Sequence, residues 1–352
     1  MNEEYIMRKR KLIWLFIFVA ILLFAALSPV YGGDPARTGT AGGEQLLVPV
    51  GARDLAMGGA NIAMTTGLDA IYWNPAGFSS MQNRAAGLFS TMNIFEDIRI
   101  SYLAVGVAAG NIGHIGVSIK TFDFGDIPVT TNADMDGASG QTFSPNFFTL
   151  GLTYSKRLTD AIQVGVTGKV ISESIPRANA SAYAFDVGIQ YHQLGGIDGL
   201  SVGFAVKNIG TDLNYEGGGL VQQFVNPETG LQEFTQRSAA THTLPANFEL
   251  GVGYKREVAE NNTVRITGIF QNNDFGNDSY SFGGEYAYSD LIAVRGGYRF
   301  YDGIDAEDVL YKLTLGVGLH YKLGATDVTF DYAYRDSQYF NGNNMFSIKI
   351  GF

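Results

Sequence analysis

The sequence is built from short segments in which large apolar residues alternate with small or polar ones. From Leu313 to Tyr321, every second residue is large and apolar, and the residues between are Thr, Gly, Gly and His. Because successive side chains of a β-strand point to opposite faces, such a segment predicts a strand with one apolar and one small or polar face. The same alternation recurs at 148–154, 162–166, 248–254, 328–334 and 346–352.

The polar faces carry too little charge for a water-soluble sheet. Charged residues make up 16% of the chain, against about 25% in an ordinary soluble domain. A barrel in a membrane turns its apolar face to lipid and its small, polar face to the lumen, which fits this inventory. We therefore predict an all-β fold, a transmembrane antiparallel β-barrel, with a soluble sandwich or propeller as the alternative.

The alternating segments predict about fourteen strands. They lie near 84–93, 97–108, 112–123, 145–156, 160–172, 179–192, 198–209, 244–256, 261–272, 277–288, 290–301, 308–322, 326–335 and 345–352. The even-numbered connections are short, and the four long ones, 124–144, 210–243, 301–307 and 336–344, are all odd-numbered. Short periplasmic turns and long outer loops are typical of outer-membrane barrels, so both ends of the barrel domain are expected in the periplasm.

The first 32 residues predict a secretory signal peptide. A basic cluster at Arg8–Lys11 precedes the apolar run Leu12–Leu27, and small residues follow at Gly32 and Gly33. This is the order of a signal peptide, with an uncleaved anchor as the alternative. Its removal leaves 20 Lys and Arg against 32 Asp and Glu, a net charge of −12. So acidic a chain is not expected to bind nucleic acid.

Residues 33–82 differ from the barrel strands expected over 83–352. They contain a possible strand at 60–64, a helical turn at 68–73 and the breaker Asn74-Pro75-Ala76-Gly77. The segment is too polar to span a membrane and too apolar to hang in water. We expect it to fold back into the lumen as a hatch.

The chain ends on an alternating strand whose last residue is Phe352. This resembles the C-terminal signal by which the outer-membrane barrel assembly machinery recognises its clients. The signal peptide and the absence of cysteine, which excludes a lipoprotein, support the same destination. The expected surroundings are outer-membrane lipid.

The N-terminal segment resembles the PorV/PorQ family, within the wider group of FadL-like barrels. The residues that carry the resemblance are Gly39–Gly43, Gln45–Arg53, Ala56–Ala60 and Tyr72–Gly77. The resemblance implies a fourteen-stranded barrel with an N-terminal hatch and a role in type IX secretion, where cargo proteins are bound by their C-terminal domains. The alternative that it implies is a transporter of small hydrophobic compounds across the outer membrane.

The family motif has a structural interpretation and a functional one. Gly58, Gly59 and Gly77 suit positive φ or close backbone approach, and Pro75 ends the helical turn before it. Arg53, on a supposed small-residue strand, is expected to pair with an acid inside the barrel wall, with Asp54 and Asp69 as candidates. The motif residues are expected to hold the hatch, with contact to a ligand as the alternative. They are Arg53, Gly58, Gly59, Asn74, Pro75 and Gly77.

No residue pattern in the sequence predicts catalysis, a cofactor or a metal site. The four histidines are not at ligand spacing, and no hydrolase motif is present. The outer loop from Gly217 to Phe234 carries apolar residues where solvent is expected, which indicates a protein partner or a lid. Its candidate contacts are Leu220, Phe224 and Phe234. A sealed polar lumen with apolar loop tips would favour a partner role, involving secreted cargo or a secretion translocon. An apolar pocket or a sideways opening would favour transport.

Overall fold

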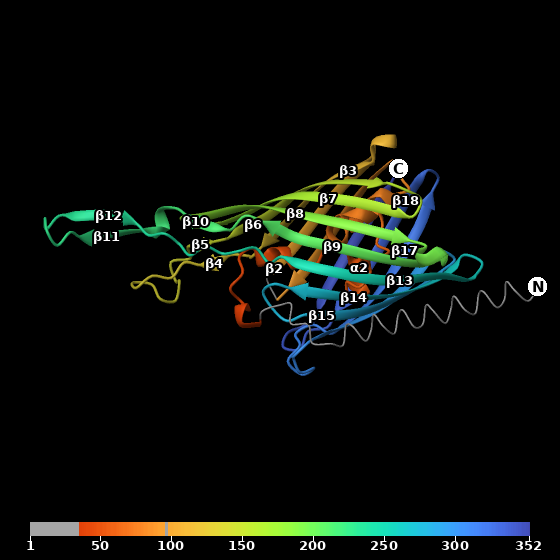
Figure 1. The fold of residues 1–352 in the computed structure, drawn as a ribbon. Coiled ribbons are helices and arrows are strands. Elements are labelled where there is room, and N and C mark those ends of the chain that lie inside the picture. The colour runs from red at the N-terminus through yellow and green to blue at the C-terminus, as the bar shows by residue number, and fades with distance from the viewer. Residues whose placement is uncertain (1–34, 96–97) are drawn as a thin grey trace, which may run out of the picture.

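The computed structural model describes residues 35–95 and 98–352. The signal peptide predicted at 1–32 lies outside these residues, and its removal stays a prediction. Within the described residues, no helix is both long and apolar enough to cross a membrane. The chain is organised instead around one large antiparallel sheet (Figure 1).

The sheet has 15 strands, and one of them, β10, is a short addition to the edge of β8. The other fourteen close into a barrel because β8 pairs with β9 and β1 pairs with β19. The barrel strands are β1 (Ala85–Ile94), β2 (Ile98–Ala108), β3 (His114–Asp123), β6 (Asn146–Arg157), β7 (Ile162–Ile175), β8 (Ala178–His192), β9 (Leu200–Gly210), β13 (Asn247–Ala259), β14 (Asn262–Asn273), β15 (Ser279–Tyr288), β16 (Ile292–Tyr301), β17 (Leu313–Leu323), β18 (Thr326–Arg335) and β19 (Asn343–Gly351). The prediction of a fourteen-stranded antiparallel barrel is confirmed.

The connections separate by length as predicted. Ala85 N donates to Phe352 O at 3.2 Å where the first residues of β1 meet the last residues of β19, so the barrel begins and finishes at one rim. The connections at this rim have at most seven residues. They join β2 to β3, β6 to β7, β8 to β9, β13 to β14, β15 to β16 and β17 to β18. The opposite rim carries the long loops. These contain β4 (Ile127–Pro128), β5 (Thr142–Phe143), β10 (Asn214–Glu216), β11 (Val221–Val225) and β12 (Gln232–Gln236).

The apolar faces of the strands point outward. On β17, Leu315 is 49% exposed and Leu319 is 52% exposed, whereas Thr314, on the opposite face of the strand, is 5% exposed. This is the reverse of a soluble sandwich, whose apolar face is buried. The exposed belt continues round the barrel and matches the lipid-facing surface that the alternation predicted.

The N-terminal segment lies inside the barrel. It consists of short helices and turns, and Ala52, Met57 and Ile62 are fully buried in it. Its elements are η1 (Pro35–Arg37), η2 (Glu44–Leu46), α2 (Ala52–Ala56), η3 (Gly67–Asp69), α3 (Ala70–Trp73) and η4 (Pro75–Ser80). The predicted helical turn at 68–73 is confirmed. The predicted strand at 60–64 is wrong, because these residues form turns against the closed wall, where no sheet edge is free to pair with them.

Candidate functional site

The hatch lies against wall glycines whose missing side chains make room for its backbone or its side chains. A Cβ on Gly165 of β7 would lie 2.3 Å from the carbonyl oxygen of Pro75, and one on Gly188 of β8 would lie 2.0 Å from Asn74 Oδ1. Real Cβ atoms do not approach other atoms so closely, so these positions require glycine. We call the wall glycines that contact the hatch in this way the socket glycines. They are Gly106, Gly116, Gly165, Gly188, Gly203, Gly251, Gly253, Gly283, Gly297 and Gly316.

The Asn-Pro-Ala-Gly motif fixes the hatch to β8. Asn74 is fully buried, and its Nδ2 donates to Ile62 O at 2.9 Å and to Ile189 O at 3.2 Å. Its Oδ1 accepts from Ala76 N at 3.2 Å, which caps η4 where Pro75 begins it. Gly77 serves by close approach, since its Cβ would lie 2.0 Å from Thr65 O. The motif therefore joins two parts of the hatch to the wall.

Gly58 and Gly59 turn the chain at the end of α2. Their φ angles are +69° and +73°, in the left-handed region that favours glycine. Gly58 also lies against β16, where a Cβ on it would be 3.3 Å from Tyr298 N. Both the expected positive φ and the expected close approach are therefore found at this turn.

Arg53 pairs with an acid of the barrel wall, as expected, but the acid is neither Asp54 nor Asp69. Arg53 lies on helix α2 and not on a strand, and its Nε is 3.2 Å from Glu285 Oε2 on β15. The helix points Asp54 away from it, toward Asn61 Nδ2 at 2.7 Å. Asp69 is taken by another cation, Lys349 Nζ, at 2.6 Å.

These pairs belong to one buried network that links the hatch to five strands. Glu285 also binds Arg265 of β14 and Arg295 of β16, the latter at 2.6 Å. Arg295 continues to Asp331 of β18 at 2.7 Å, and Lys349 of β19 binds Asp331 at 3.1 Å. The lock network, as we call it, comprises Arg53, Asp69, Arg265, Glu285, Arg295, Asp331 and Lys349. Through Arg53 and Asp69, it ties the hatch helices α2 and η3 to the same part of the wall.

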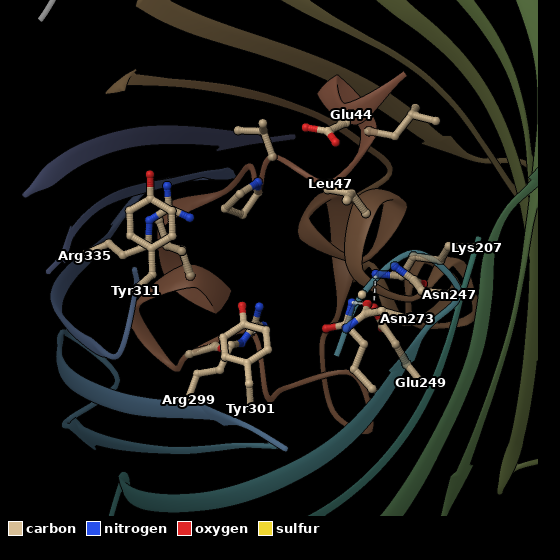
Figure 2. Close-up of a pocket in the computed structure, with 18 of the residues that line it drawn as sticks. Glu44, Leu47, Lys207, Asn247, Glu249, Asn273, Arg299, Tyr301, Tyr311 and Arg335 are labelled. Atoms are coloured by element: carbon tan, nitrogen blue, oxygen red, sulfur yellow. Dashed lines mark hydrogen bonds and ion pairs between the residues drawn. The ribbon is translucent and has the colours of Figure 1, made fainter. Parts of the chain in front are cut away.

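Above the hatch, toward the long loops, lies a cavity of about 500 Å³ that we call the vestibule. Its floor is the hatch itself, with Tyr72 and Trp73 among its residues. Figure 2 shows two walls facing each other: Arg299, Tyr301, Tyr311 and Arg335 on one side, and Lys207, Asn247, Glu249 and Asn273 on the other. The vestibule thus combines aromatic surface with many polar groups.

The wall has one irregularity near the vestibule, a bulge between β8 and β9. The register shifts between Phe185 and Val187, and Asn208 takes φ +61°. Asn208 N donates to Asp186 Oδ1 at 2.8 Å, and Lys169 Nζ donates to Asn208 Oδ1 at 2.8 Å. Side chains of Asp186 and Lys169 therefore bridge the bulge.

The outer loop predicted to meet a partner forms a two-stranded hairpin, β11 and β12, that extends well beyond the barrel at the left of Figure 1. Phe224 is 41% exposed and Phe234 is 72% exposed. Leu220 lies half-buried at its base, where its carbonyl accepts from Arg237 N at 2.9 Å. The hairpin therefore presents two of the three candidate residues to solvent.

Phe352 lies at the rim where the barrel closes. Its side chain is 63% exposed, and its carbonyl accepts from Arg84 N at 2.8 Å and Ala85 N at 3.2 Å. Because the backbone bonds survive substitution, Phe352→Ala is expected to leave the finished barrel intact but to lower severalfold the amount assembled in cells. The amount of protein in the outer membrane would measure assembly, and the heat-dependent shift of its gel band would show whether the barrel is folded. Tyr321→Ala, which removes a comparably exposed aromatic from β17, is the control. Equal yields would contradict a role for Phe352 as the assembly signal.

The residues that sequence reasoning missed lie on the small faces of the late strands. Glu285, Arg295 and Asp331 are buried at inward positions among glycines, serines and threonines. A charge isolated on such a face is a signal that could have found them, because an inward charge needs a partner across the lumen. Nothing local in the sequence says which partner it takes.

Comparisons with known proteins agree with this architecture. No curated protein sequence matches the chain. The Pseudomonas putida toluene transporter TodX is similar in structure, with a TM-score of 0.55 and 14% identity over 86% of this chain and 99% of that one. The CymD monoaromatic hydrocarbon channel has a TM-score of 0.52 and 14% identity over 86% and 97%. At such identities the likeness shows the fold alone, a FadL-like barrel.

The family comparison goes further than the fold. Residues 33–272, which run from the hatch through β14, match the family described as type IX secretion system protein PorV. The match extends well past residues 39–80, where the motifs are concentrated. Because it spans more than half of the chain, this protein belongs to the PorV family, the non-enzymatic outer-membrane β-barrel components of type IX secretion.

Proposed function

We propose that this protein binds secreted cargo proteins at the cell surface through their C-terminal domains, with the hairpin β11–β12 as the principal contact. The family role in type IX secretion supplies the class of partner. The observation that carries the proposal is the exposed apolar surface of the hairpin. Barrel assembly machinery, outer-membrane lipid and a secretion translocon complete the proposed set of partners.

The pairing of the hairpin gathers three of its four apolar side chains on one face, and Phe224, which pairs with Glu233, lies on the other. Val221 pairs with Gln236, Gln223 with Phe234, and Val225 with Gln232, so Val221, Val225 and Phe234 share a face. Val225 is 59% exposed and Phe234 is 72% exposed. An isolated two-stranded hairpin is marginally stable in water, and exposed apolar surface of this kind marks an interaction site. Among the described residues, no further strand pairs with its outer edges, so a strand of the partner can add to them.

The hatch has a supporting role in this proposal. Residues 33–82 form the hatch and residues 83–352 the barrel, with the signal peptide at 1–32 removed on export. The motif residues and the lock network hold the hatch closed, so the lumen need not conduct any solute. Binding then takes place on the outer side, at the loops and the vestibule.

Transport of small hydrophobic compounds is the second candidate. Two of the similar structures are a toluene transporter and a monoaromatic hydrocarbon channel, and apolar residues such as Tyr72 and Trp73 form the vestibule floor. The bridged bulge at Asn208 and the charged vestibule walls favour binding over transport. Toluene uptake by cells with and without the barrel would test transport directly. Faster uptake by cells with the barrel would support the transport function.

Replacing two residues on the apolar face of the hairpin tests the binding role. Val225→Ser with Phe234→Ser should leave the barrel folded and reduce co-purification of secreted proteins by tenfold or more. The reason is that each buried apolar side chain contributes roughly 1.5–3 kcal/mol at an interface. The measurement is a pull-down from native outer membrane with mass spectrometry.

The matched control is Met135→Ser, at an outer-loop residue that is 76% exposed but lies outside the hairpin. It removes a comparable apolar side chain from the same side of the membrane and should not change co-purification. If the double variant recovers as much secreted protein as the wild type does, the hairpin is not the contact. Failure of the wild-type protein to recover them at all would contradict cargo binding itself.

A further inference from the structure

The vestibule is rich in positive charge although the protein is acidic. Its lining holds five basic residues and two acidic ones, in a chain whose net charge is −10. Two of the basic residues, Lys169 and Lys207, are neutralised by Asp186 at 2.5 Å and Glu249 at 2.9 Å. The excess comes from the opposite wall, where the remaining bases are Arg299, Lys312 and Arg335.

Arg299 and Arg335 are held in place but not neutralised. Neither lies within 4.0 Å of a carboxylate in the part of the chain that the structure describes. Arg335 is 8% exposed, and its Nε and Nη2 donate to Asn343 Oδ1 at 3.1 Å and 2.8 Å while its guanidinium stacks on Tyr311 at 3.6 Å. Arg299 Nε donates to Ser281 Oγ at 2.8 Å, and Nη2 to Gly58 O at 3.2 Å.

Both guanidiniums therefore keep hydrogen-bond donors free. Each carries five N–H donors, and the described contacts involve only the Nε and Nη2 atoms, leaving Nη1 without a described partner. Arg299 and Arg335 come from β16 and β18, which flank β17, and they lie opposite Lys312 and Thr314, so their backbones are about 12 Å apart. Two fixed guanidiniums at this spacing, facing a cavity, suit a planar anion such as a carboxylate.

The facing wall holds acceptors that also have no partner. Asn247 is 7% exposed and Glu249 is 4% exposed, yet Asn247 Oδ1 and Glu249 Oε2 accept no hydrogen bond within the described structure. Leaving buried acceptors unsatisfied costs free energy, so a ligand that donates to them is favoured. Figure 2 shows Asn247 and Glu249 directed toward the cavity, across from the two arginines.

We propose that the vestibule is a binding site for a carboxylate group whose neighbouring N–H or O–H groups donate to the facing wall. Arg299 and Arg335 hold the carboxylate, and Asn247 and Glu249 accept from the adjacent donors. A volume of about 500 Å³ accommodates a few residues of peptide or a small organic acid. The carboxylate comes from an acidic segment of a secreted protein or from a soluble dicarboxylate, and only the first of these rests on the proposed function.

The test is calorimetric titration of the purified full-length barrel with three probes. They are a short peptide of alternating glycine and aspartate with blocked ends, the same peptide with asparagine for aspartate, and succinate. The aspartate peptide is expected to bind and the asparagine peptide to bind at least tenfold more weakly. A tenfold difference in affinity corresponds to about 1.4 kcal/mol, which is the size expected for the loss of one charge-assisted hydrogen bond.

Variants then place the site. Arg299→Gln and Arg335→Gln are each expected to weaken binding of the aspartate peptide about tenfold or more. Arg177→Gln is the matched control, because it removes an exposed arginine outside the vestibule, whose Nη2 donates to Gly218 O at 3.1 Å. A heat-modified gel shift shows whether each variant folds. If either arginine variant fails to fold, the wild-type comparison of the aspartate and asparagine peptides still decides whether a carboxylate is required.

Each result has one meaning. Binding of the aspartate peptide that both arginine variants weaken supports a peptide source, and equally sensitive binding of succinate alone supports a small dicarboxylate. Equal binding of the aspartate and asparagine peptides, no binding of any probe, or binding insensitive to both folded variants overturns the site. Since hairpin variants and pull-downs are not used here, failure of this site leaves the proposed hairpin contact untouched, and failure of cargo binding removes only the peptide source of the carboxylate.

Discussion

Glu285→Gln is expected to destabilise the protein by about 3–5 kcal/mol, the cost of removing one partner from a buried ion pair. Glu285 is the single acid between three arginines, Arg53, Arg265 and Arg295. Its side chain is 2% exposed, and that of Arg295 is 5% exposed. Without the carboxylate, these cations face one another in a site that water enters poorly, so Arg53 should lose its tie to β15 and α2 should loosen from the wall, where it packs chiefly against β17 and β18.

The measurement combines thermal unfolding with limited proteolysis. The variant should unfold at a lower temperature, and the hatch should be cut near Arg53 under conditions in which the wild-type hatch is protected. Glu260→Gln removes an exposed acid from the turn between β13 and β14 and should change neither readout. A Glu285→Gln barrel as stable and as protected as the wild type would show that the lock network does not hold the hatch.

The barrel strands could be predicted because their signal is local. A lipid-facing strand must alternate, and a periplasmic turn must be short, so Leu313–Tyr321 and the turn at 324–325 reveal their structure without reference to the rest of the chain. The exposed apolar face of β17 confirms this interpretation. The sequence also placed Phe224 and Phe234 in an outer loop, although not in a separate hairpin.

The hatch could be predicted only in outline, because its structure is imposed by the wall. Residues 60–64 resemble a strand in composition, but a closed barrel offers no free edge for them, and the left-handed turn at Gly58 and Gly59 bends the chain beforehand. Arg53 was expected to pair with an acid close to it in sequence. Its partner Glu285 is 232 residues away, and only the closed barrel brings the two together.

The many glycines of the chain had a use that composition alone did not show. In a lumen-facing strand, glycine is consistent with flexibility, with a bulge or with a neighbour in close contact. The structure shows the third case at the socket glycines, where backbone or side-chain atoms of the hatch occupy the space of the absent side chains. A glycine on the inward face of a barrel strand therefore indicates where an internal segment touches the wall.

Gly165→Ala is expected to displace the hatch at the Asn-Pro-Ala-Gly motif and to destabilise the protein by about 1–3 kcal/mol, the usual cost of overpacking a filled core. The new Cβ would lie 2.3 Å from both the carbonyl carbon and oxygen of Pro75 and 2.6 Å from Ala76 N. All three are backbone atoms, so no side-chain rotation relieves the contact. Either β7 or the start of η4 must move.

Gly87→Ala is the matched control, since it makes the same change in a barrel strand where an added Cβ meets nothing within 4 Å. It should leave the melting temperature and the protease protection of the hatch unchanged, while Gly165→Ala lowers both. A second substitution, Pro75→Ala, removes ring atoms but keeps the backbone, so it should not rescue Gly165→Ala. If the Gly165→Ala barrel keeps wild-type stability with a protected hatch, the wall is more adaptable than the close contact with Pro75 implies, and the socket glycines would then not be required for seating the hatch.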